Sequence, residues 1–195
     1  MANVIKLRKG LDVNLKGKAA KEEFQVKKPA VYALMPDDFT GMKPKVVVKE
    51  NDVVKVGDAL FVDKNHPEIK FVSPVSGRVT MVERGDRRKV LSVRVEADAE
   101  LQYVDFGKKS AGQMTAQEVK ALLLESGLFA FFKQRPYDVT ANPTDTPKAI
   151  FVSAFNSMPL AADFEYVLRG READFQAGLD ALAKMAKTYL GVSSK

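Results

Sequence analysis

Residues 69–82 read IKFVSPVSGRVTMV, two short apolar runs joined by a turn rich in serine, proline and glycine. Such residues favour a turn because proline presets φ and glycine tolerates positive φ. Outward from this stretch, further apolar runs follow one another closely, with turn-forming residues between them. The expected strands cover residues 30–34, 45–49, 53–56, 59–62, 69–72, 79–82 and 90–95. This spacing predicts a small all-β barrel or sandwich.

The pattern changes beyond residue 100. Thr115 and Glu118 form a capping box, which predicts a helix over residues 115–126, and Gly127 suits the left-handed position that ends a helix. A continuous apolar run at 149–155 predicts a strand that is buried on both faces. Apolar residues at every third or fourth position from 175 to 189 predict a helix of about five turns, up to Gly191. The second half is therefore expected to be α/β. It has too few strands to complete a doubly wound sheet, as in a piece of a longer subunit.

The composition excludes several kinds of site. The chain has 195 residues and no cysteine, so disulfides, thiol nucleophiles and cysteine-bound zinc or iron–sulfur clusters are excluded within it. A single histidine, His66, makes a multi-histidine metal site or a Ser-His-Asp triad hard to build. No carboxylate has a convincing partner for acid–base work. We therefore expect no catalytic and no metal-binding residues.

Charge and hydropathy also limit the partners. The net charge is +6, but basic and aromatic residues do not interleave as in RNA-recognition modules, which argues against a nucleic-acid partner. The lysines and arginines of residues 6–28 are expected to be solvated, or to contact the acidic side of a neighbouring subunit. The apolar runs are far shorter than the roughly 20 residues of a membrane-spanning helix, so we expect no transmembrane segment.

Three groups of residues, taken in order, resemble one family. The first is Lys9-Gly10-Leu11-Asp12 with Gly41-Met42-Lys43-Pro44, the second is residues 71–79 (FVSPVSGRV) with Arg84-Gly85, and the third is residues 125–128, 135–137, 149–154 and 159–162. Together they are similar to the A subunits of the sodium-translocating NADH:quinone oxidoreductase. The second group also resembles the C subunit of the Rnf-type electron-transfer complex and, more distantly, lipoyl domains.

Residues 1–28 are basic and show no sustained periodicity, so we expect a loosely packed N-terminal arm with a short strand at 4–7. After this arm, the resemblance implies an α+β fold that begins with a barrel-sandwich hybrid (lipoyl-like) domain at 29–100. Residues 101–195 would be the start of a truncated α/β (Rossmann-like) domain, related to the flavin-bearing subunit of respiratory complex I. Lys64 follows Asp63 as the lipoate-bearing lysine follows its neighbour in lipoyl domains, but a plain turn lysine is the favoured interpretation.

The resemblance also implies a function. The chain would be a peripheral subunit on the cytoplasmic side of the bacterial inner membrane, in a complex that couples NADH oxidation and quinone reduction to Na⁺ export. FMN, FAD and iron–sulfur centres would be carried by other subunits, and the fragment alone would not be catalytic. The rival interpretation is a stand-alone barrel-sandwich carrier or adaptor domain that takes no part in electron transfer. Residues 115–191 argue against it, because a carrier domain would end near residue 100.

The loop after the first helix carries the strongest functional signal. In flavin- and NADH-binding relatives this helix runs into a glycine-rich loop, whose backbone amides approach phosphates closely. Here residues 128–136 read LFAFFKQRP, so phenylalanines stand where small residues are needed. We therefore expect neither FMN nor NADH to bind at this loop.

The same phenylalanines could instead contact a quinone, ubiquinone or menaquinone, in an apolar pocket with a polar rim. The alternatives are ordinary core packing, which is the favoured interpretation, and a subunit interface. Residues 38–42 form a second candidate surface. The candidate quinone-binding residues are Phe39, Met42, Phe129, Phe131, Phe132, Arg135 and Tyr137.

Overall fold

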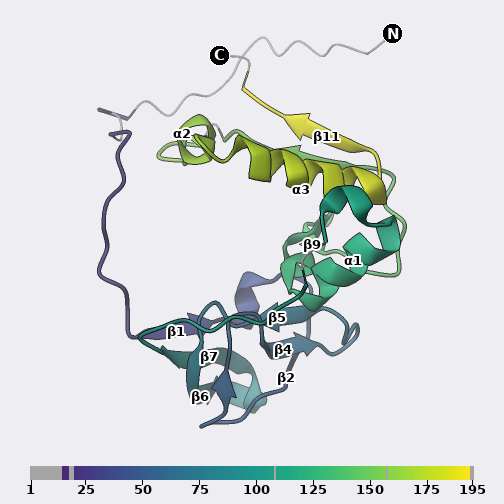
Figure 1. Ribbon diagram of the computed structural model, residues 1–195. Helices are drawn as coiled ribbons and strands as arrows, with labels where there is room; N and C mark the ends of the chain where they lie inside the picture. The colour runs from purple at the N-terminus through teal and green to yellow at the C-terminus, as the bar shows by residue number, and fades with distance from the viewer. Residues whose placement is uncertain (1–14, 18–19, 108, 157, 194–195) are drawn as a thin grey trace.

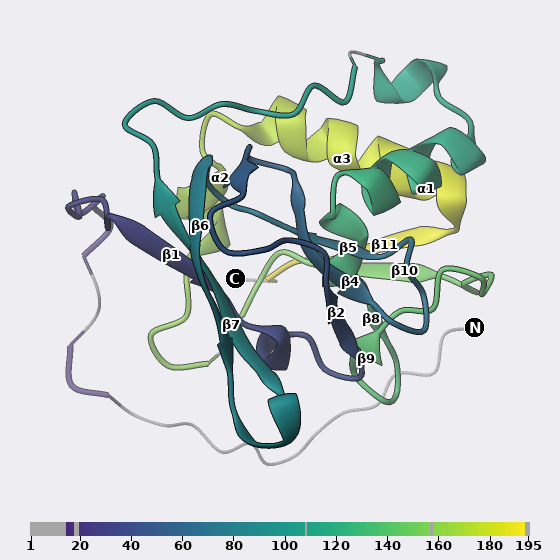
Figure 2. The same ribbon diagram turned by 90° about the horizontal axis from the view of Figure 1, so that it is seen from below.

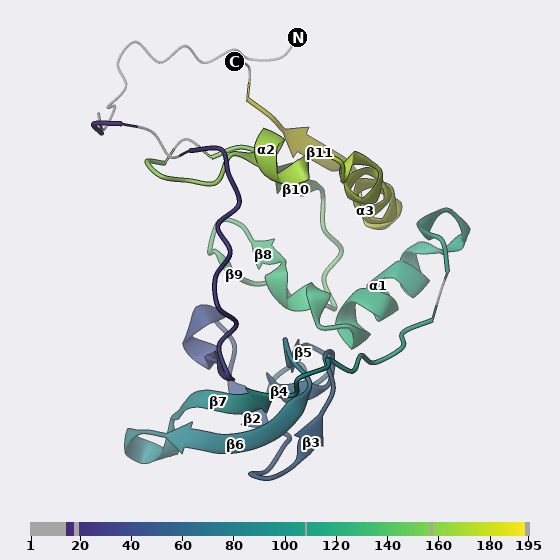
Figure 3. The ribbon, with the colours of Figure 1, turned by 60° about the vertical axis from the view of Figure 1, so that its left-hand side comes forward.

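The computed structural model describes residues 15–17, 20–107, 109–156 and 158–193 (Figure 1). It contains a β-rich part at the N-terminal side and a second part of helices and short strands. Figures 1 and 3 show the second part lying over one end of the first. The strand expected at residues 4–7 lies outside the described residues. No helix within the described ranges is long and apolar enough to cross a membrane.

The β-rich part is built from two antiparallel sheets (Figure 2). One sheet has the order β1-β7-β6-β3, and the other has the order β2-β4-β5. The strands are β1 (Val31–Leu34), β2 (Pro44–Val46), β3 (Val53–Val54), β4 (Ala59–Asp63), β5 (Lys70–Val72), β6 (Gly77–Arg84) and β7 (Val90–Ala97). Two 3₁₀ turns, η1 (Pro36–Asp38) and η2 (Asp86–Arg88), connect β1 to β2 and β6 to β7.

The core of this part lies between the two sheets. Buried and exposed residues alternate in the first half of β6, as expected when one face of a sheet is buried, whereas β4 is buried at four consecutive positions, Leu60 to Asp63. The most deeply buried are Leu60, Phe61, Ile69, Phe71, Val79, Val93 and Val95. The predicted all-β sandwich is confirmed. The predicted strand at 45–49 is shorter than expected, because β2 ends at Val46 and residues beyond it lead into the turn at 50–52.

The second part begins with η3 (Ala111–Gln113) and the helix α1 (Ala116–Glu125). Thr115 caps α1 as predicted: its hydroxyl accepts the Glu118 backbone N–H at 3.3 Å, and the Glu118 carboxylate accepts the Thr115 N–H at 2.8 Å. Gly127 ends the helix with φ 76°, also as predicted. A 3₁₀ turn, η4 (Leu128–Phe131), and the hairpin of β8 (Lys133–Gln134) and β9 (Val139–Thr140) follow.

The remaining elements are β10 (Ile150–Ser153), α2 (Phe164–Leu168), α3 (Glu172–Met185) and β11 (Thr188–Gly191). β10 and β11 pair in parallel, and α2 and α3 lie in the connection between them, so this region is α/β as predicted.

Two predictions in this region were wrong. The strand at 149–155 is not buried on both faces, since Phe151 is 77% exposed and β10 pairs with β11 alone among the described strands. The last helix ends at Met185 rather than near Gly191, because Ala186 is extended (φ −161°) and Tyr189 belongs to β11. There Tyr189 lies opposite Phe151, with the two rings stacked at 5.2 Å.

The two parts are joined at the end of α1. Gly127 lies against β5 so closely that a Cβ built on it would come within 2.7 Å of Val72 Cγ1. Next to it, the Lys70 ammonium pairs with the Glu125 carboxylate at 3.4 Å. Away from this junction, the ammonium group of Lys21 in the basic arm lies 2.6 Å from the carboxylate of Asp163, the N-cap residue of α2. This arm lysine therefore has an acidic partner within the same chain.

Candidate functional site

The two surfaces that the sequence pointed to separately lie side by side in the structure. Phe39 follows η1 and Met42 precedes β2, while the other five candidates belong to η4 and the β8–β9 hairpin. The backbone connects the two segments directly, since the Thr140 N–H donates to the Thr40 carbonyl at 2.9 Å. Within the second segment, the Ala141 N–H donates to the Phe132 carbonyl at 2.9 Å. The candidate residues thus gather where η4 and β9 pack against the barrel.

Four rings form a row that we call the aromatic column: Phe61, Phe71, Phe39 and Phe131. Phe61 and Phe71 stack in the core at 5.0 Å, and Phe39 meets Phe71 edge to face at 4.5 Å. Phe131 meets Phe39 edge to face at 6.1 Å and is itself 70% exposed. The column therefore runs from the centre of the barrel to the surface, where one ring is open to solvent.

Phe129 and Phe132 behave differently from Phe131. Their rings stack at 5.4 Å, and Phe129 is 4% exposed. Both pack against the core of the barrel, as does Met42. These three side chains fill the junction between the two parts of the molecule, in agreement with the core-packing interpretation.

The polar candidates stand at the tip of the β8–β9 hairpin. Arg135 and Tyr137 are exposed, and the Arg135 guanidinium lies 3.5 Å from the Asp138 carboxylate. Arg135 presents N–H donors and Tyr137 presents a hydroxyl that can donate or accept. Together with Phe131 they give this surface an aromatic face with polar groups nearby.

Two hollows among the described residues lie away from these candidates. A groove of about 690 Å³ runs along residues 46–51 and beside Val82 and Arg84 of β6. A pocket of about 500 Å³ lies at the carboxyl ends of β10 and β11, between residues 154–156, the α2 region and Phe175. None of the seven candidate residues lines either hollow. Sequence reasoning missed both, although residues that directly follow a parallel strand are a known position for ligands.

The pocket of about 500 Å³ beside α2 is lined in part by the charged side chain of Asp163. The hydrogen bond from Lys21 to Asp163, together with the Tyr166 backbone N–H, lowers the pKa of the Asp163 carboxyl, and the same contact raises the pKa of Lys21. Asp163 thus stays ionised and is engaged by its partners. No group of three potential metal-ligating side chains occurs within the described ranges.

The turn around Lys64, which resembles the lipoyl hairpin, is held in place by hydrogen bonds to Asp63. Asp63 is buried, and its carboxylate accepts the backbone N–H groups of Lys43 at 3.2 Å and of Asn65 at 3.0 Å. Lys64 is exposed, and its backbone N–H donates to the Lys43 carbonyl at 2.7 Å. Asp63 therefore fixes the turn, and Lys64 is one of its surface residues.

Comparison with known proteins finds similarity along most of the chain. Residues 5–98 match the family model described as the NqrA N-terminal barrel-sandwich hybrid domain, and residues 114–195 match that of the NqrA second alpha/beta domain. The A subunit of the Na(+)-translocating NADH-quinone reductase from Pseudomonas aeruginosa (strain UCBPP-PA14) is 36% identical over 96% of this chain and 42% of its own length. Proteins of the same name from Serratia proteamaculans (strain 568) and Actinobacillus pleuropneumoniae serotype 5b (strain L20) are 37% and 36% identical, each over 93% of this chain and 41% of the relative. The chain thus spans about two fifths of the length of these curated relatives.

Proposed function

Because the chain belongs to the NqrA family, we propose that it serves as part of the A subunit of a Na⁺-translocating NADH:quinone oxidoreductase. Such a complex couples NADH oxidation and quinone reduction to Na⁺ export. In this proposal the chain is a peripheral component on the cytoplasmic side of the bacterial inner membrane, with the other subunits as its partners. The observation that carries the proposal is the match of both family domains, in order, to the two parts of the molecule.

The carrier or adaptor interpretation finds less support. A carrier domain has no need of a second part, yet α1 and η4 are built into the barrel through Gly127, Phe129 and Phe132. Removing them would expose apolar surface on the barrel, which is costly.

The proposed role in the complex is tested by placing an affinity tag on the protein in its native host and purifying it from the membrane. The expected result is co-purification of further subunits with Na⁺-stimulated NADH:quinone reductase activity. Recovery of the tagged chain alone, or with a biosynthetic carrier system, would contradict the proposal.

A second element of the proposal is that the chain binds neither FMN nor NADH at the loop after α1, and that other subunits carry FMN, FAD and iron–sulfur centres. The residues do not fit a phosphate cradle: Phe129 and Ala130 are buried, and Gly127 faces Val72 instead of open space. Backbone amides in such a cradle must be free to approach the phosphate. Calorimetric titration of the chain with FMN and with NADH should give no binding, and micromolar affinity for either would overturn this element.

A third element is a quinone-proximal role for the surface around Phe131. Its exposed ring lies next to Phe39, with the donors of Arg135 and Tyr137 on the neighbouring hairpin. A quinone ring needs an apolar contact and one or two donors for its carbonyl oxygens. An architectural role for the same residues is the alternative.

Three variants separate these roles, with a short-chain ubiquinone and a menaquinone analogue as the probes. Phe131→Ala should weaken quinone binding with little change in stability, while Phe132→Ala should mainly lower stability. Phe151→Ala is the matched control, because that ring is similarly exposed but lies in the β10–β11 pair. Equal quinone affinity in the Phe131 and Phe151 variants would refute the quinone-proximal role and favour the architectural one.

A further inference from the structure

The groove on the barrel has the features of a peptide site, and it is independent of the quinone surface. It lies between the segment at 46–51 and the outer half of β6, and its volume is about 690 Å³. Val46, Val48 and Val82 are partly buried and pack against the core, so they form an apolar floor. This floor is in reach of side chains from an extended segment laid along the groove.

One wall of the groove is the outer half of β6, and the other is the segment 46–51, in which β2 ends at Val46. β2 is the outermost strand of its sheet, with β4 on its other side. On the other wall, β3 covers β6 only near Gly77 and Arg78, and the contacts of residues 51 and 52 with β6 end at Val79. The outer half of β6 therefore offers backbone groups that an added strand could pair with.

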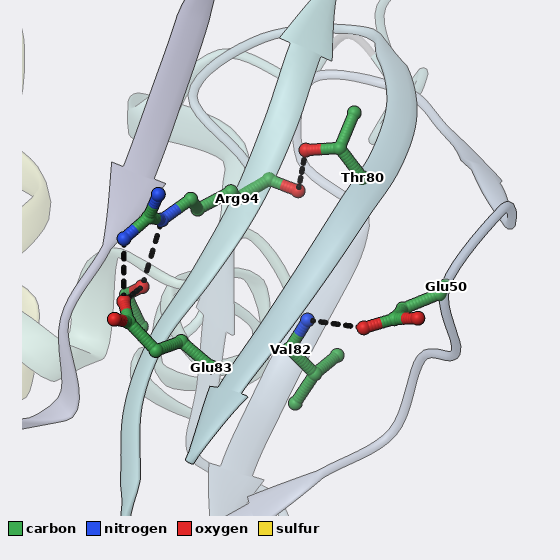
Figure 4. A network of polar contacts seen from close by, with 6 residues as sticks. Glu50, Thr80, Val82, Glu83 and Arg94 are labelled. Carbon is green, nitrogen blue, oxygen red and sulfur yellow. Dashed lines mark hydrogen bonds and ion pairs between the residues drawn. The ribbon is translucent and has the colours of Figure 1, made fainter. Parts of the chain in front are cut away.

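The side chain of Glu50 is hydrogen-bonded to one of these backbone groups. Its carboxylate accepts the Val82 N–H at 3.2 Å, on the side of β6 that faces away from β7 (Figure 4). That is the position which the carbonyl oxygen of an adjacent strand would take. The carboxylate thus satisfies one N–H group on the open edge of β6. The same contact shows that the Val82 N–H can bind a hydrogen-bond acceptor from this side.

The rim of the groove is cationic. Lys49 and Arg84 are exposed along its walls, and the β6–β7 turn beyond Arg84 carries Arg87 and Arg88 together with Asp86. These two arginines have φ values of 53° and 63°, an arrangement that costs energy in non-glycine residues. Glu50 is the acidic side chain that lines the groove itself. A partner with carboxylates would therefore meet complementary charge.

We infer that this groove binds an extended acidic segment of a partner protein, which adds as a strand to the open edge of β6. Alternate apolar side chains of the segment contact Val46, Val48 and Val82, and its carboxylates face Lys49 and Arg84. The incoming carbonyl displaces the Glu50 carboxylate from the Val82 N–H. The main-chain bonds supply affinity, and the charges select the acidic partner.

The test uses the whole 195-residue chain and an acetylated, amidated peptide of four Glu-Val repeats, followed by ¹⁵N NMR. The expected result is saturable shifts at the amides of Val46, Val48 and Val82, with slower hydrogen exchange at Val82. The double variant Lys49→Glu with Arg84→Glu should bind about tenfold more weakly. The matched control is Lys133→Glu with Lys148→Glu, which changes the net charge equally at exposed sites outside the groove.

Glu50→Ala gives the sharpest distinction. A residue that only stabilises the edge would leave peptide affinity unchanged when removed, whereas the proposed displacement predicts tighter binding, by about tenfold, because a competing anion is gone. Absence of binding, equal binding of a Lys-Val repeat peptide, or unchanged affinity in the Glu50 variant would overturn the inference. Binding of phosphatidylglycerol vesicles through the same residues, without peptide binding, would replace it with a membrane contact.

Discussion

Substitution of Gly127 by alanine tests the junction between α1 and the barrel. An L-residue at φ 76° costs about 1–2 kcal/mol. The new methyl group would also meet Val72 Cγ1 at 2.7 Å and Cγ2 at 2.8 Å, and forcing an extra carbon into a packed site costs about 1–3 kcal/mol. The expected total is about 2–5 kcal/mol, which in a chain of this size lowers Tm by roughly 4–20 °C.

Gly170 offers a matched control for this experiment. It has the same φ of 76°, but nothing lies within 4 Å of a Cβ built on it. Gly170→Ala should therefore show only the backbone cost of about 1–2 kcal/mol. Both variants are compared with the parent chain by thermal and urea unfolding. If Gly127→Ala loses no more stability than Gly170→Ala, the end of α1 is not packed against β5 and the reasoning is refuted.

Three further predictions concern the same region. Phe129→Ala should lower the free energy of unfolding by about 3–5 kcal/mol, while the exposed Phe131→Ala should change it little, as urea midpoints would show. Thr115→Ala should cost about 1 kcal/mol through loss of the helix cap, and an unchanged midpoint would contradict this. The pKa of Glu118 is lowered to about 2, first by the hydrogen bond from Lys109 and then by those from Thr115. The ionised carboxylate therefore stabilises the fold fully above pH 4.5, and this stabilisation is lost as the pH falls toward 2. Glu118→Gln should abolish that part of the pH dependence of stability.

Local signals predicted most of the fold. The capping box at Thr115, the left-handed stop at Gly127 and the strands of the barrel depend on residues close together in the sequence, and all appear in the structure. The predicted end of the last helix was wrong because the apolar spacing continues into residues 188–190, where pairing with β10 decides the conformation. Periodicity cannot detect that pairing, because it is a contact between distant segments.

The candidate quinone-binding residues were proposed from the sequence, and their arrangement in space was not predicted. The hydrogen bond between Thr140 and Thr40 joins segments 100 residues apart, so no local pattern could place the two candidate surfaces together. Nor could the sequence separate Phe129, which is buried, from Phe131, which is exposed, since both are apolar residues in one short turn. Their roles toward quinone stay a prediction.

The aromatic column gives the molecule a spectroscopic reporter of its own. Phe131 stands in solvent, and ring-to-ring contacts connect it through Phe39 to Phe71 and Phe61 in the interior. Close-packed interiors transmit small displacements rather than absorb them. A molecule that binds to the exposed Phe131 ring should therefore shift the ring-proton resonances of Phe61. Binding at the surface can thus be measured at a buried residue of the unlabelled protein.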